Sequence, residues 1–132
     1  MRNLEDEMHV IITAAEAPRF ELPGVRFTAL ASPSRGSAEI CTWQITVEAG
    51  LVSEQSHTID RDEIFMVTAG AIRLSPEGPV LRPGDAAVVP AGSPIQLDNV
   101  GEGEARAFVV IQAGFTGTMA DGTVVSTPPW AL

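Results

Sequence analysis

The chain has 132 residues and a net charge of −9, from 17 acidic and 8 basic side chains. Its length corresponds to one domain with a core of its own, and its acidity excludes the basic surface that nucleic acids require. No stretch approaches the run of about 18 apolar residues that a membrane span needs, and residues 1–9 do not resemble a signal peptide. With the single Cys41, these features predict one domain in the cytoplasm, with no membrane or nucleic-acid partner.

Short alternating segments predict β-strands from the beginning of the chain. Residues 9–13 (HVIIT) and 25–30 (VRFTAL) are the first two, separated by a Leu-Pro-Gly sequence. Residues 38–50 alternate with period two and are rich in β-branched and aromatic side chains, which is typical of a strand with one buried face. The face expected to be buried carries Cys41, Trp43, Ile45 and Val47.

Further short strands follow, with glycine- and proline-rich turns between them. They are expected at residues 63–68, 71–74, 86–89, 95–99 and 105–112. Sequences such as SPEGP (75–79) and GEGE (101–104) are typical of turns. Many short strands and no long helical segment predict an all-β sandwich or barrel.

The last segment is a tail, about residues 114–132. Residues 123–126 are expected to form a short strand. The following Pro128-Pro129 pair stiffens the chain and presents Trp130 at a defined place. Because an exposed tryptophan leaves a large apolar surface in water, we expect Trp130 to dock on the barrel or on a partner subunit.

Residues 50–70 carry a glycine, a histidine, a glutamate and a second glycine at Gly50, His57, Glu63 and Gly70. This spacing resembles the first motif of the cupin superfamily. In that motif a His-x-His pair precedes the glutamate, and here the second position of the pair is Ile59.

Residues 84–99 (GDAAVVPAGSPIQLDN) resemble the second cupin motif. The matching positions are Gly84, Pro90, Gly92 and Asn99, and the histidine position is occupied by Ile95. The resemblance implies an antiparallel jelly-roll β-barrel, with residues 1–132 forming one cupin domain. It also implies a homodimer, because small cupins are often dimers.

The two isoleucines remove half of the metal ligands that the resemblance implies. A catalytic first-row metal site needs about three protein ligands, and isoleucine has no lone pair to give. No cofactor is therefore expected, and a divalent metal is disfavoured. If an ion is bound, His57 and Glu63 are its expected ligands.

In the cupin arrangement, strand parity turns several apolar side chains into the barrel together with His57 and Glu63. The expected cavity suits a small, partly hydrophobic organic molecule, with Asn99 adding an amide at one end. The predicted ligand-binding residues are Trp43, Ile45, Ile59, Phe65, Ile95 and Leu97.

Three functions stay open for this cavity, and the sequence does not decide whether the chain is an enzyme. In the first, a metal-independent isomerase, dehydratase or cyclase uses His57 and Glu63 as acid and base. Burial should raise the pKa of Glu63 unless His57 pairs with it. The second is a binding or sensing module without chemistry, and the third is a metal-dependent oxygenase with non-standard ligands. Structural roles compete for both residues: a solvated loop for His57, and ion pairs with Arg61 or Arg73 for Glu63.

Overall fold

A computed structural model describes residues 9–132 of the chain. In this part, short antiparallel strands are accompanied by two single 3₁₀ turns, η1 (Pro33–Arg35) and η2 (Pro129–Ala131), and by no α-helix. No helix there is long and apolar enough to cross a membrane. The all-β fold predicted from the alternating segments is confirmed.

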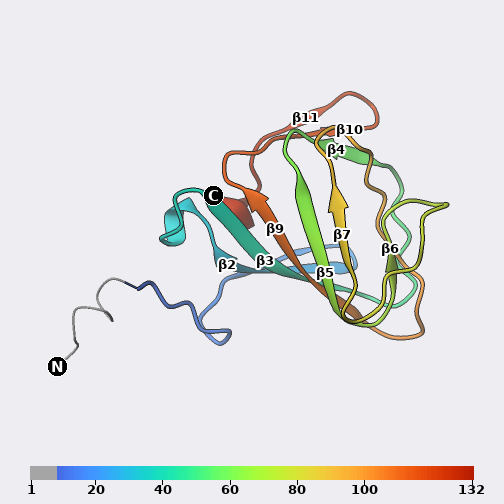
Figure 1. The fold of residues 1–132 in the computed structure, drawn as a ribbon, viewed down its shortest axis with the longest axis horizontal. Coiled ribbons are helices and arrows are strands. Elements are labelled where there is room, and N and C mark those ends of the chain that lie inside the picture. The colour runs from blue at the N-terminus through green and yellow to red at the C-terminus, as the bar shows by residue number, and fades with distance from the viewer. Residues whose placement is uncertain (1–8) are drawn as a thin grey trace.

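The larger layer is a six-stranded antiparallel sheet (Figure 1). Its three central strands are residues 40–47, 105–112 and 63–69, and each pairs with the next over most of its length. In spatial order the strands are β1 (Arg19–Leu22), β2 (Val25–Ala31), β3 (Ile40–Val47), β9 (Ala105–Gln112), β5 (Glu63–Ala69) and β7 (Ala86–Val89).

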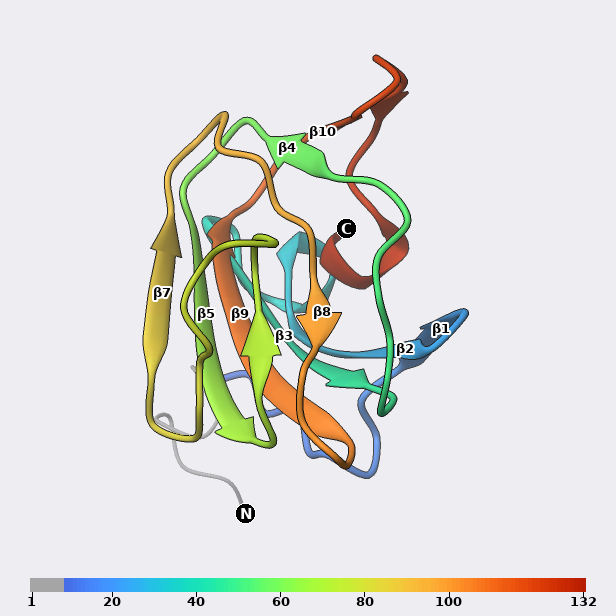
Figure 2. The ribbon, with the colours of Figure 1, turned by 90° about the vertical axis from the view of Figure 1, so that its right-hand side faces the viewer.

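Two small sheets form the other layer. One contains β11 (Val124–Val125), β10 (Gly117–Met119) and β4 (His57–Ile59), and the other pairs β6 (Ile72–Arg73) with β8 (Asp98–Asn99). Figure 2 shows β4, β8 and β10 across from β3, β5 and β9. This arrangement of two facing antiparallel layers is the jelly roll that the cupin resemblance implies.

Alternation along the central strands separates the core from the outer face. In β3 the predicted set Cys41, Trp43, Ile45 and Val47 is buried, and β9 alternates in the same way. The strand register places buried residues side by side in rows across the sheet. One row contains Trp43, Val109 and Phe65, and the next contains Cys41, Ile111 and Glu63. Glu63 is thus a carboxyl in a row of apolar side chains.

Two predicted strands differ from the structure. Residues 9–13 form no strand, because β1 occupies the edge of β2 with which they would have paired. The Leu-Pro-Gly sequence is instead the turn of the β1–β2 hairpin, where Gly24 has a φ of +76°. Of the predicted strand 95–99, only Asp98–Asn99 belongs to β8, and Ile95 forms a single bridge with His57.

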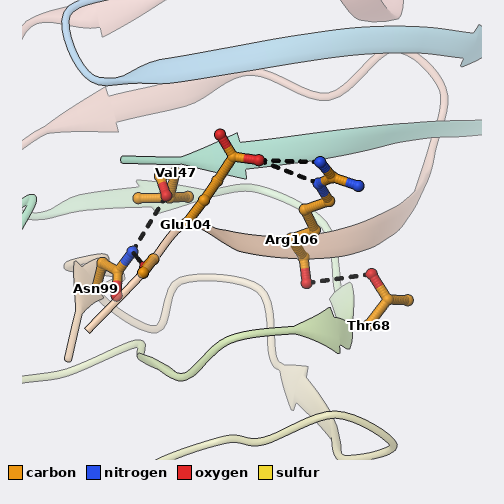
Figure 3. Close-up of polar contacts among 6 residues, drawn as sticks. Val47, Thr68, Asn99, Glu104 and Arg106 are labelled. Carbon is orange, nitrogen blue, oxygen red and sulfur yellow. Dashed lines mark hydrogen bonds and ion pairs between the residues drawn. The ribbon is translucent and has the colours of Figure 1, made fainter. Parts of the chain in front are cut away.

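Asn99 has a structural role and does not line the cavity, which corrects the expectation that its amide faces a ligand. Its Nδ2 lies 3.1 Å from the carbonyl oxygen of Val47 (Figure 3). It also lies 3.0 and 2.9 Å from those of Glu48 and Gly103, and the Asn99 Oδ1 accepts the Gly101 N–H at 3.0 Å. A buried amide with these partners ties the end of β3 to the turn before β9. The glycine-rich turn GEGE is therefore held by a side chain outside it.

Candidate functional site

A cavity of about 350 Å³ lies between the six-stranded sheet and the small sheet of β4, β10 and β11. The predicted acid–base residues His57 and Glu63 both line it. So do all six residues predicted to bind a ligand, which are Trp43, Ile45, Ile59, Phe65, Ile95 and Leu97. The structure thus brings together side chains from four separate segments of the sequence, residues 43–45, 57–59, 63–65 and 95–97.

Glu63 is the first residue of β5 and is 5% exposed. It lies between Ile111 of β9 and Val89 of β7. Within residues 9–132 its side chain has no hydrogen-bond or ion-pair partner, so it forms no ion pair with Arg61 or Arg73. Burial raises its pKa from 4.5 to about 7, as expected for a carboxyl that His57 does not neutralise. Near neutral pH this group is present in both its acid and its base form.

His57 is the first residue of β4, and its backbone pairs with Ile95 and with Met119. Two backbone hydrogen bonds with Ile95, of 3.0 and 2.8 Å, fix its position. Burial lowers the pKa of the imidazole, because removing it from water disfavours the charged form. A neutral imidazole keeps one N–H donor and one nitrogen acceptor available to a ligand.

The turn at residues 60–62 holds these two residues in place. Asp60 accepts hydrogen bonds from the Thr116 N–H at 2.8 Å and from the Thr116 hydroxyl at 3.1 Å. The bond from the Thr116 backbone is the main reason that the pKa of Asp60 is lowered. Asp62 accepts the Ala91 N–H at 2.9 Å. These two carboxylates therefore connect β4 and β5 to neighbouring loops.

Aromatic side chains that the sequence analysis did not assign to the site form other parts of the wall. Phe27 stacks on Trp130 with ring centroids 3.7 Å apart and planes 8° apart, and Phe115 stacks on Trp43 at 5.9 Å. Trp130 therefore docks on its own barrel, as one of the two predicted alternatives states. Its position in the cavity wall depends on the path of the tail, which no local pattern in the sequence specifies.

The donors at the expected metal position do not fit a conventional metal site. Ile59 and Ile95 line the cavity with His57 and Glu63, so half of the implied ligand positions carry aliphatic side chains. Within residues 9–132, no group of three His, Cys, Asp or Glu side chains lies close enough to hold an ion. Two donors alone bind a first-row divalent metal weakly.

Cys41 is buried on the inner face of β3, and it does not line the cavity. Burial raises the pKa of its thiol, and its Sγ lies 3.4 Å from the carbonyl oxygen of Ala131 in the tail. These features agree with the predicted position of Cys41 on the buried face of its strand.

Comparisons with known proteins agree with this fold. The family profile described as Cupin domain matches residues 43–111, which is more than half of the chain. A sugar phosphate isomerase from a cupin superfamily, from Silicibacter pomeroyi DSS-3, is 25% identical; the match covers 83% of this chain and 81% of that one, with a TM-score of 0.62. KdgF from Halomonas sp. is 21% identical, with 79% and 92% of the chains covered and a TM-score of 0.64. The polyketide cyclase RemF from Streptomyces resistomycificus is 13% identical, with 89% and 84% covered and a TM-score of 0.69. No curated protein sequence matches this chain.

Proposed function

Because this chain belongs to the Cupin domain family, we propose that its cavity binds a small, partly hydrophobic organic molecule, on which Glu63 transfers protons and His57 supplies an acidic N–H without a metal. The observation that carries the proposal is the state of Glu63. Its carboxyl has a pKa of about 7 and no partner among residues 9–132, and it shares one cavity with a neutral imidazole. A pKa close to the working pH gives an acid–base catalyst both of the forms it needs.

The two groups suit reactions that move a proton next to a carbonyl. The ionised carboxylate of Glu63 accepts a proton from the carbon beside the carbonyl, and the N–H of His57 donates a hydrogen bond to the oxygen on which negative charge develops. The proton then returns to another carbon in an isomerisation, or it goes to a departing hydroxyl group in a dehydration. In a cyclisation the carbanion attacks a second carbonyl, and the new alkoxide takes the proton.

Two of the similar structures support this reaction class. One is a sugar phosphate isomerase and another is a polyketide cyclase, so rearrangements of small organic molecules occur on this fold. The poor fit of the donors to a metal ion favours the metal-independent version over an oxygenase. A binding or sensing role that uses the same cavity is the alternative, and it needs His57 and Glu63 only as polar contacts.

Exchange of carbon-bound hydrogen in D₂O tests the proposal. Ketones and hydroxyketones would be incubated with the wild-type chain, with Glu63→Gln and with His57→Ala, and followed by NMR. We expect exchange with the wild type and a loss of about 100-fold or more with Glu63→Gln, because an isosteric amide cannot take up the proton. Glu102→Gln removes a charge from an exposed turn and serves as the control. Unchanged exchange in both cavity variants would refute the catalytic roles. Ligand binding without any exchange by the wild type would favour the sensing role.

The proposal includes a homodimer formed through the outer face of the six-stranded sheet, and a cytoplasmic location in which the single thiol stays reduced. Ile64 and Met66 of β5 and Val88 of β7 are exposed on this face, and Ile64 pairs directly with Val88. A chain with a net charge of −9 repels its own copies least where its surface is uncharged. Val88→Asp should shift the mass measured by light scattering from dimer to monomer, and an unchanged mass would remove this face as the interface.

A further inference from the structure

Most of the aromatic side chains of this chain surround the cavity. The sequence contains five phenylalanines, two tryptophans and no tyrosine. Five of these seven residues line the cavity, which are Phe27, Trp43, Phe65, Phe115 and Trp130. Phe20 and Phe108 do not line it, so the aromatic side chains of the core cluster are those that face this cavity.

The strand register separates part of this aromatic wall from the acid–base pair. Phe27 lies on β2 and Glu63 on β5, with β3 and β9 between them in the sheet. Three strand spacings of about 4.8 Å separate their strands by roughly 14 Å. The register separates the two residues further, because Phe27 is in the row of Val67, four residues along β5 from Glu63. The Phe27–Trp130 stack therefore lies at one side of the cavity and the carboxyl at the other. An elongated ligand can place flat apolar rings at the first side and a polar group at the second.

The wall carries no group that could neutralise an anion. All basic side chains of the chain are arginines, and none of those within residues 9–132 lines the cavity. The same residues contain no α-helix whose N-terminus could bind a phosphate. His57 stays neutral because burial lowers its pKa, and Glu63 adds negative charge when it ionises. A buried phosphate or carboxylate without a counter-charge costs several kcal/mol.

We propose that the ligand is a neutral, planar aromatic molecule of two or three fused rings that carries a hydroxyl or keto oxygen. Its rings pack on the Trp43–Phe115 side chains with their far edge towards the Phe27–Trp130 stack, and its oxygen lies at His57 and Glu63. A volume of about 350 Å³ is near the lower limit for ligand pockets, which fits a molecule of this size. This inference rests on the proposed function only in placing the ligand in this cavity.

A pair of probes that differ by one phosphate tests the substrate class. Binding of 2-naphthol, 2-naphthyl phosphate and glucose 6-phosphate to the full chain would be measured by calorimetry at pH 7. We expect 2-naphthol to bind at least about tenfold more tightly than 2-naphthyl phosphate, because desolvating an unpaired phosphate is unfavourable. Glucose 6-phosphate should give no binding heat.

Leucine variants locate the binding site. Phe115→Leu should weaken 2-naphthol binding by about fivefold, since it removes an aromatic face from the wall. Phe108→Leu is the matched control, because Phe108 lies on β9 but does not line the cavity. If Phe115→Leu does not fold, Trp130→Leu replaces it. A thermal melt of each variant establishes that it is folded.

Several results would overturn the inference. Equal or tighter binding of either phosphate would mean that the cavity accepts anions, and equal weakening by Phe108→Leu would place the naphthol elsewhere. Absence of binding by all three probes would also reject the aromatic class. None of these results changes the assignment of Glu63, which hydrogen exchange and titration test separately. Conversely, naphthol binding without any proton-transfer activity would reject the proposed function and leave the ligand class in place.

Discussion

Replacing Glu63 with glutamine should stabilise the protein at alkaline pH. The carboxyl is 5% exposed, and burial raises its pKa from an ordinary value of 4.5 to about 7. When the pKa of an acid is higher in the folded state, folding favours the protonated form. Stability then falls as the pH rises from the unfolded pKa to the folded pKa. A pKa shift of this size lowers the unfolding free energy by about 3 kcal/mol at pH values above 7.

Glutamine has nearly the same shape and never ionises, so the Glu63→Gln variant avoids this loss. Near pH 5 the wild-type carboxyl is largely protonated in the folded protein, and the two proteins should differ little in unfolding free energy. The unfolding free energy of the variant minus that of the wild type should therefore increase by about 2 to 3 kcal/mol between pH 5 and pH 8. Urea unfolding at both pH values, followed by tryptophan fluorescence, measures the change.

His57 affects the pH dependence of the unfolding free energy in the same way in the wild type and in Glu63→Gln. The pKa of His57 is lowered in the folded state. Its contribution to the unfolding free energy is therefore fully present above pH 6.5, and it is lost as the pH falls towards the pKa of the folded protein. Subtracting the wild-type curve from the variant curve removes this contribution. Glu102→Gln, in an exposed turn, controls for the change in net charge. If the Glu63→Gln advantage does not grow between pH 5 and pH 8, the carboxyl is not desolvated as the structure indicates, and the basis of the proposed function is lost.

The remaining predictions concern the fold and the metal. Asn99→Ala should lower the unfolding free energy by about 3 kcal/mol, because it leaves buried backbone groups without partners; a loss below about 1 kcal/mol in urea unfolding would contradict this. Deleting residues 127–132 should lower stability by about 2 kcal/mol or more through the loss of Trp130 packing on Phe27, and an unchanged thermal midpoint would contradict the docking of the tail. Elemental analysis of protein purified without chelators should find iron, manganese, nickel and zinc well below one equivalent, because residues 9–132 contain no group of three His, Cys, Asp or Glu side chains that could hold an ion. A full equivalent of any of them would show that the donor set has been misjudged.

Local patterns were sufficient for much of the fold. Period-two alternation in residues 38–50 identified the buried face of β3, because one residue in two points to the same side of a strand. The expectation was wrong at residues 9–13, since the strand that pairs with β2 is β1, which follows them in the chain. The spacing of His57 and Glu63 identified the cupin motif, and the structure places both in one cavity with the six predicted apolar residues.

The β-strand alternation, the turn positions and the two isoleucines that replace metal ligands could all be read before folding, because each is a property of neighbouring residues or of a fixed spacing. Which distant segments meet depends on the three-dimensional packing of the whole chain. This packing assigned Asn99 to the GEGE turn, brought Phe27 and Trp130 together in the cavity wall, and left Glu63 in an apolar row without a partner among residues 9–132. The protonation of Glu63 depends on that last result. Its pKa is set by how much water and how many partners reach the carboxyl, and only the packed layers around it fix both.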